Sequence, residues 1–190
     1  MRMRLGYLLV FLMVVLNDGF AQWCCIDSSL IIKDKSTATL KLLITSALNN
    51  DLASQSQGVC GVRIKFDHKF IGDLTIDLIS PAGQKVRLIG PLGNSGISSF
   101  SKWSVTFVPC GLQAIPDPGF KKRWDNQQSW GILGKFYSGT YYPQMGCLED
   151  FNTGPVNGIW TLQIAVSYTH LRAHETVLDL VCRLLLEKKK

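Results

Sequence analysis

The chain has 190 residues, of which 46% are hydrophobic and 18% are charged, and its formal net charge is +6 at pH 7. This composition predicts one globular domain of ordinary size and excludes a disordered chain. The basic residues form no dense stripe, so nucleic-acid binding is not expected.

Residues 1–21 have the pattern of a secretory signal peptide. A basic start precedes an apolar run over residues 5–16, which is shorter than the roughly 20 residues that a membrane span needs. Small residues at Gly19 and Ala21 predict cleavage after Ala21. A transmembrane anchor is the alternative, but the short run favours a secreted or cell-surface protein without a membrane span.

Because we expect export, the cysteines are expected to form disulfides rather than metal sites. The chain has six cysteines: Cys24, Cys25, Cys60, Cys110, Cys147 and Cys182. None of them forms a CxxC pair or a Cys/His spacing that suits zinc. The preferred disulfide is Cys110–Cys147, since these two residues bracket a long loop rich in Gly, Pro and aromatic residues.

After an expected linker over residues 22–35, apolar and polar residues alternate with a period of two, which predicts strands. The alternating segments cover residues 37–44, 62–66, 74–78, 86–89, 103–107 and 160–166. Ser80-Pro81-Ala82-Gly83 interrupts the pattern and predicts a tight turn. Short strands separated by turns predict an all-β protein, an antiparallel β-sandwich over residues 36–167.

Residues 109–158 lack this periodicity and are rich in Gly, Pro, Trp and Tyr. The favoured interpretation is that the aromatic side chains pack over one end of the sandwich. The alternative is a carbohydrate- or surface-binding adhesive site, in which Trp130, Tyr141 and Tyr142 would stack against a glycan. Within this stretch, Lys121-Lys122-Arg123 is interpreted as a solvated basic run rather than a cleavage site.

Residues 168–190 break the strand pattern. Their apolar positions, among them Leu171, Val177, Leu178, Val181 and Leu184, fit a helical period better, which conflicts with an all-β fold. The segment also resembles the translation of a sequencing-adapter read-through. We therefore expect a non-native helical tail of artefactual origin and assign it no function.

Two motifs carry a resemblance to a known family. Residues 68–83 contain a His, a Gly-Asp-Leu, an alternating strand and then Ser-Pro-x-Gly, and Gly158-Ile159-Trp160-Thr161-Leu162 closes the domain. Together they resemble the P domain, or Homo B domain, of proprotein convertases and subtilisin/kexin-like serine proteases. The resemblance covers about residues 36–166. The middle of this segment resembles P-domain modules of secreted bacterial-type proteins.

The resemblance implies a jelly-roll β-sandwich similar to galactose-binding modules. It implies a non-catalytic module associated with subtilisin-like serine endopeptidases and proteolysis, whose partners are a protease domain or other domains of its polypeptide. Members of the family continue beyond the closing motif with one further strand, which the tail replaces here. That strand is expected to hold the partner of Cys60.

No catalytic triad is expected in this chain. Outside the tail the chain has one histidine, His68, and its neighbour Asp67 is predicted to point to the opposite face of the strand. No Gly-x-Ser-x-Gly motif is present. His68 is therefore interpreted as a structural residue, and the chain is not expected to be an enzyme.

A calcium ion is the one cofactor that the sequence suggests. Asp73 and Asp77 flank one strand at a separation of about 13 Å, too far apart to share an ion by themselves. Glu149 and Asp150 are the loop carboxylates that could join either of them, because calcium takes six to eight oxygen ligands. The alternative for Asp73 is a turn residue that accepts backbone hydrogen bonds.

Overall fold

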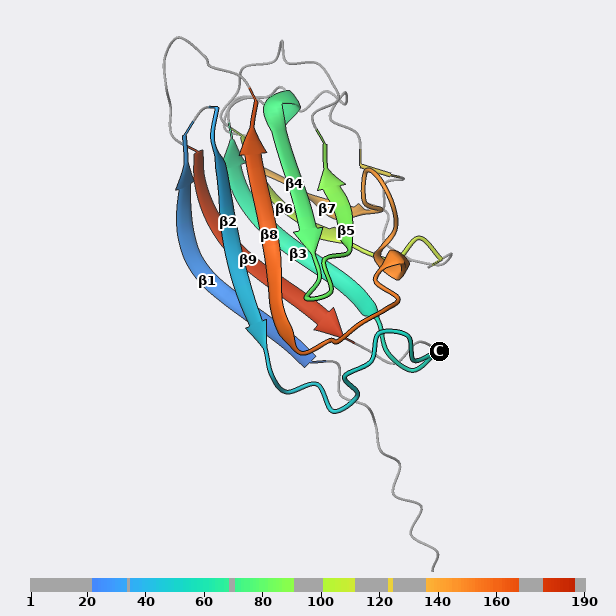
Figure 1. Cartoon of the computed structure of the whole chain (residues 1–190). Helices are drawn as coiled ribbons and strands as arrows, with labels where there is room; N and C mark the ends of the chain where they lie inside the picture. The colour runs from blue at the N-terminus through green and yellow to red at the C-terminus, as the bar shows by residue number, and fades with distance from the viewer. Residues whose placement is uncertain are drawn as a thin grey trace, which may run out of the picture.

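The structure is a computed structural model that describes residues 22–33, 35–68, 71–90, 101–111, 123–124, 136–167 and 176–186; for 22–31, 101 and 176–186 it describes the backbone alone. Two sheets pack face to face (Figure 1). The all-β sandwich expected from the alternating segments is confirmed, although not every strand pair is antiparallel. The expected signal peptide over 1–21 lies outside the described residues, as does Trp130.

The front layer in Figure 1 has four strands in the order β2-β8-β4-β5, all antiparallel. The strands are β2 Thr37–Ile44, β8 Gly158–Val166, β4 Leu74–Ile79 and β5 Lys85–Ile89. Along β2, exposed residues alternate with half-buried or buried ones. Along β8 from Trp160 onward, buried residues alternate with half-buried ones. The period of two in the sequence therefore marks the inner and outer faces of this sheet.

The back layer has five strands in the order β1-β9-β3-β6-β7. The strands are β1 Gln22–Ile32, β9 Thr176–Leu186, β3 Val59–His68, β6 Ser101–Phe107 and β7 Phe136–Tyr141. Two short 3-10 helices complete the described elements, η1 Ile71–Asp73 and η2 Leu148–Asp150.

Three expectations differ from this arrangement. The tail does not form a helix: Thr176–Leu186 is a strand that pairs with both β1 and β3, because a run of apolar residues suits a buried strand as well as a helix and tertiary pairing decides. Most of the expected linker is strand β1. The pair β6–β7 is parallel, since the long connection between these strands allows the crossover that a parallel pair needs.

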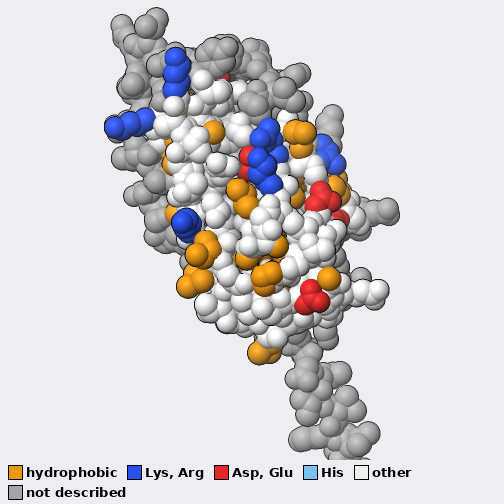
Figure 2. All heavy atoms as spheres, in the orientation of Figure 1, with side chains coloured by type: hydrophobic (Ala, Val, Ile, Leu, Met, Phe, Trp, Pro, Cys, Tyr) orange, Lys and Arg blue, Asp and Glu red, His pale blue; other side chains and the backbone are white. Residues whose placement is uncertain are grey.

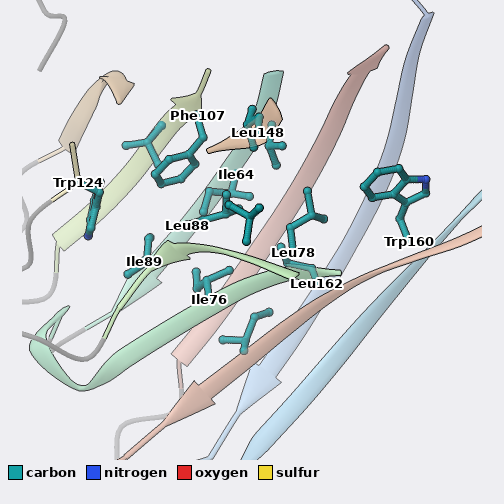
Figure 3. Packing of buried hydrophobic residues seen from close by; sticks show 14 of the residues in the cluster. Ile64, Ile76, Leu78, Leu88, Ile89, Phe107, Trp124, Leu148, Trp160 and Leu162 are labelled. Atoms are coloured by element: carbon teal, nitrogen blue, oxygen red, sulfur yellow. The ribbon is translucent and has the colours of Figure 1, made fainter. Parts of the chain in front are cut away.

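The core lies between the two sheets (Figure 3). Ile76 and Leu78 of β4 and Leu162 of β8 face Ile64 of β3 across this layer, and all four are at most 2% exposed. Trp160 is also buried, and its indole N–H donates to the carbonyl oxygen of Val156 over 2.9 Å. Since both predicted motif strands contribute to this core, the motifs are above all packing motifs.

The expected turn at Ser80-Pro81-Ala82-Gly83 connects β4 to β5. The Gly83 N–H donates to the Ser80 carbonyl over 2.9 Å, and the Gln84 N–H donates to the Ser80 hydroxyl over 3.1 Å. Gly83 has φ +84°, a conformation that costs glycine little and other residues more. This turn sets the register that brings Asp77 opposite Arg87.

Candidate functional site

A group of polar contacts lies where β6 ends and η2 begins. Cys110 and Cys147, the pair that the sequence analysis preferred, form a disulfide with a Cα–Cα distance of 5.6 Å and a sequence separation of 37. Both cysteines are half-buried. A disulfide of this kind is typical of proteins that fold in an oxidising compartment.

The carboxylates of η2 accept backbone hydrogen bonds around this disulfide. Glu149 accepts from the N–H of Cys110 over 3.0 Å and from the N–H of Gly111 over 2.6 Å. Asp150 accepts from the N–H of Cys147 over 2.8 Å. Charge-assisted bonds of this type are stronger than neutral ones, so the two carboxylates fix the loop geometry on both sides of the disulfide.

Arg123 is a residue of this group that the sequence analysis interpreted as part of a solvated basic run. One guanidinium nitrogen donates to the carbonyl oxygens of Pro143 and Gly146 over 2.9 and 2.8 Å, and the other lies 3.9 Å from each disulfide sulfur. No local signal distinguishes Arg123 from its basic neighbours, because the carbonyl groups that it binds are 20 and 23 residues away in the chain.

The structure does not bring the four expected calcium ligands together. Asp77 lies in β4, is 4% exposed, and binds Arg87 through two bonds of 2.9 and 3.2 Å and Lys85 at 3.3 Å. Asp73 lies in η1, is buried, and accepts from the N–H of Ser167 through its backbone oxygen. Calcium at these residues stays a prediction that their geometry does not support.

The Asp77–Arg87 pair also changes the acidity of the guanidinium. Its hydrogen bond to Asp77 raises the pKa of Arg87, desolvation works against the rise, and the charge of Asp77 adds to it. Arg87 is therefore cationic at every physiological pH. We interpret the pair as a structural ion pair on the sheet rather than a catalytic acid and base.

One group of three metal-type ligands comes together in the described part of the chain: Cys110, Cys147 and Glu149. Two of its members are joined in the disulfide, and a disulfide sulfur offers no thiolate to a metal ion. This group is therefore a cross-linked corner of the fold and does not form a metal centre.

The two described aromatic residues that were expected to bind a glycan differ in their burial. Tyr141 is 2% exposed and makes an edge-to-face contact with Trp124, whose ring also contacts Phe107. Burial raises the pKa of the Tyr141 phenol. Tyr142 is half-buried. The Tyr141 ring thus belongs to the core, in agreement with the packing interpretation, and a glycan role for this loop stays a prediction.

His68 and Asp67 lie at the end of β3 as the sequence analysis expected. His68 is 4% exposed, whereas the Asp67 carboxylate is on the other face and lies 3.5 Å from the ammonium of Lys102. Alternation along the strand separates the two side chains. Asp67 therefore does not orient His68 as a triad carboxylate orients its histidine.

Comparison with known proteins supports the family resemblance. Residues 59–115 match the family model described as Proprotein convertase P-domain, so the resemblance to this class of protease-associated, non-catalytic accessory domain is confirmed over that segment. No curated protein matches the sequence. In the part of the chain that the structure describes, no helix is long and apolar enough to cross a membrane.

Two solved structures are similar to this chain, and the first of them shares its fold. A chain of the Aeromonas sobria serine protease complex with its chaperone is 16% identical, with a TM-score of 0.50, and the match covers 89% of this chain and 27% of that one. The serine protease of Aeromonas sobria is 16% identical, with a TM-score of 0.48, and the match covers 87% of this chain and 26% of that one. This chain thus spans about a quarter of the length of these proteins.

Proposed function

We propose that this chain is a non-catalytic P-domain module of a secreted protein, which packs against the catalytic domain of a subtilisin-like serine endopeptidase and stabilises it. The match of residues 59–115 to the P-domain family carries the proposal. These residues contain β3, β4, β5 and β6 and supply inner-face side chains to the core. The matched segment therefore supplies β3, the middle strand of the back sheet, and β4 and β5 of the front sheet.

The chemistry of the described residues agrees with an accessory role. The buried histidine has no carboxylate directed at it from Asp67, and the carboxylates of η2 bind backbone amides. The bonds of these carboxylates fix the loops on both sides of the disulfide. A module of this type acts through the surface that it offers to a partner domain, rather than through a reaction of its own.

A domain replacement tests the proposal. In the serine protease of Aeromonas sobria, the segment that this chain matches is replaced by the full chain, and a second variant lacks the segment. We expect the chimera to hydrolyse a peptide substrate and to have a half-life at 45–55 °C (roughly the midpoint range of mesophilic domains) about fivefold or more above that of the deletion variant. A chimera no longer-lived than the deletion variant contradicts the proposal.

The full chain alone, incubated with the same substrate, serves as the control. We expect no hydrolysis above the buffer rate, since a P domain is an accessory domain. Hydrolysis by the purified chain, sensitive to a serine-protease inhibitor, would show that the chain is itself an enzyme.

A further inference from the structure

The outer face of the front sheet carries an exposed pair of large apolar side chains. Leu43 of β2 and Ile159 of β8 are directly opposite each other in the sheet register, and they are 64% and 50% exposed. Cross-strand partners on one face lie about 5 Å apart. The two side chains therefore form one continuous apolar surface and not two scattered residues.

The next row of the sheet extends this surface. Thr161 of β8 is opposite Ile79 of β4, and both are half-buried. We call Leu43, Ile159, Thr161 and Ile79 the apolar face. Figure 2 shows hydrophobic side chains on this side of the molecule, several of them in its lower half, with most of the basic side chains above these.

Cations border the apolar face at both ends of that row. Lys41 is opposite Thr161, and Lys85 is opposite Ile79. Lys41 is exposed, and the Lys85 side chain is 49% exposed, whereas the carboxylate of Asp77 that binds it is 6% exposed. The charges that a partner meets at this border are therefore positive, which suits a partner patch bordered by carboxylates.

The outer face of the back sheet has a different character. Its β3 and β6 strands carry Arg63, Lys65, Asp67 and Lys102 on the side away from the core. Asp67 and Lys102 form an ion pair across the two strands. Phe136 of β7 is opposite Lys102 and is 60% exposed, a single apolar side chain beside these charges. Charged residues are depleted at the centre of protein interfaces, so the β3–β6 part of this face is a poorer docking surface than the paired apolar residues of the front sheet.

We infer that the apolar face is the surface on which the catalytic domain packs, and that it fits an apolar patch bordered by Asp or Glu side chains. The inference rests on the proposed function. The structurally similar serine protease chain is about four times longer than the part matched, so in that chain the same fold lies within a much larger polypeptide. A partner domain is therefore the occupant to which we commit, in preference to a second copy.

Variants of the chimera test the surface. Leu43→Lys with Ile159→Lys places two charges in the centre of the apolar face, and we expect the half-life to fall at least fivefold, toward that of the deletion variant. Lys41→Glu, at the border, should lower it about twofold. The matched control is Lys65→Glu with Lys102→Glu on the other sheet, which should leave the half-life within a factor of two of the unmodified chimera.

The outcomes separate this inference from the proposed function. If the unmodified chimera is no more stable than the deletion variant, the proposed function fails and the inference fails with it. If the unmodified chimera is stabilised and the Leu43→Lys, Ile159→Lys variant is stabilised equally, the function stands and the apolar face is not the contact. Circular dichroism of each variant in the full chain verifies that the substitutions leave the sandwich folded.

A second measurement needs no substitution. Hydroxyl-radical footprinting reports the solvent exposure of individual side chains, and we expect oxidation of Leu43 and Ile159 to be at least threefold slower in the chimera than in the full chain alone. Equal oxidation in both contradicts the inference. Protection that rises with the concentration of the isolated chain would show that a second copy covers the face, which also contradicts it.

Discussion

Arg123 and Glu149 show how single residues fix the corner that carries the disulfide. Arg123 donates to two carbonyl oxygens of the 143–146 segment, and Glu149 accepts from two amides at the end of β6. Each therefore ties together chain segments that lie far apart in the sequence. These two side chains thus supply hydrogen-bond partners to backbone groups of the loop.

Tyr141 supplies a prediction that distinguishes a core residue from an exposed ligand-binding residue. Burial raises the pKa of its phenol above the ordinary value of 10.0. Because the folded state then keeps the proton longer than the unfolded state, this residue stabilises the fold fully below pH 10, and the contribution is lost as the pH rises beyond it. The difference in absorbance at 295 nm between the full chain and Tyr141→Phe should show a phenol that ionises above pH 10.

A midpoint at the ordinary pKa of tyrosine would contradict the burial of Tyr141. A tyrosine on the surface would ionise at its ordinary pKa, and the difference titration would then have its midpoint near pH 10. That outcome would place the ring in solvent and restore the stacking role expected as the alternative for this loop. Tyr142→Phe, a change at a half-buried neighbour, provides the comparison.

At the scale of elements, β8 depends on a glycine where it begins. Gly158 has φ +138°, and a Cβ atom there would lie 2.8 Å from the Cβ of Pro81, which belongs to the turn between β4 and β5. Few residues other than glycine adopt this φ, and the contact is closer than two carbon atoms allow. The start of β8 and the β4–β5 turn are thus packed directly against each other.

Gly158→Ala should therefore destabilise the full chain by about 2–3 kcal/mol, from backbone strain and the contact with Pro81 together. Gly83→Ala is the matched control, because Gly83 also has positive φ but a Cβ there would meet nothing within 4 Å; strain alone should cost about 1 kcal/mol. Urea unfolding followed by tryptophan fluorescence measures both. Equal losses would show that β8 does not pack on the turn.

Alternation in the sequence predicted the strands of the front sheet because each has one buried and one outer face. In β2, for example, Thr39 and Lys41 are exposed while Leu42 and Ile44 are buried. Strand β7 was missed, since Phe136–Tyr141 contains a glycine and its outer residues include an exposed phenylalanine. Arg123 is exposed, as expected for a solvated run, but its bonds to Pro143 and Gly146 could not be predicted because these partners are 20 and 23 residues away.

At the scale of the whole molecule, strand order and pairing direction could not be derived from local pattern. Strand β9 lies between β1 and β3, so a segment near one end of the sequence pairs with two segments from the first third of the chain. The family's further strand was expected to be replaced here by a helical tail, and the structure instead has Thr176–Leu186 of that tail in strand form after β8. Such non-local pairing depends on the whole core and not on residue periodicity.

The outer faces of the two sheets differ in their side chains. The back sheet carries charged residues over β3 and β6, and the front sheet carries the Leu43–Ile159 pair. A free-standing module gains nothing from an exposed apolar pair, whereas a module that packs against another domain buries it and gains free energy. This asymmetry agrees with an accessory role in a larger assembly.

The central claim is that the sandwich packs against a protease catalytic domain and shares its stability, and scanning calorimetry of the chimera tests this claim most directly. Coupled domains unfold together, so we predict one main transition for the chimera, at a higher temperature than the transition of the deletion variant. Two separate transitions, one at the temperature of the deletion variant and one at that of the full chain alone, would contradict the claim.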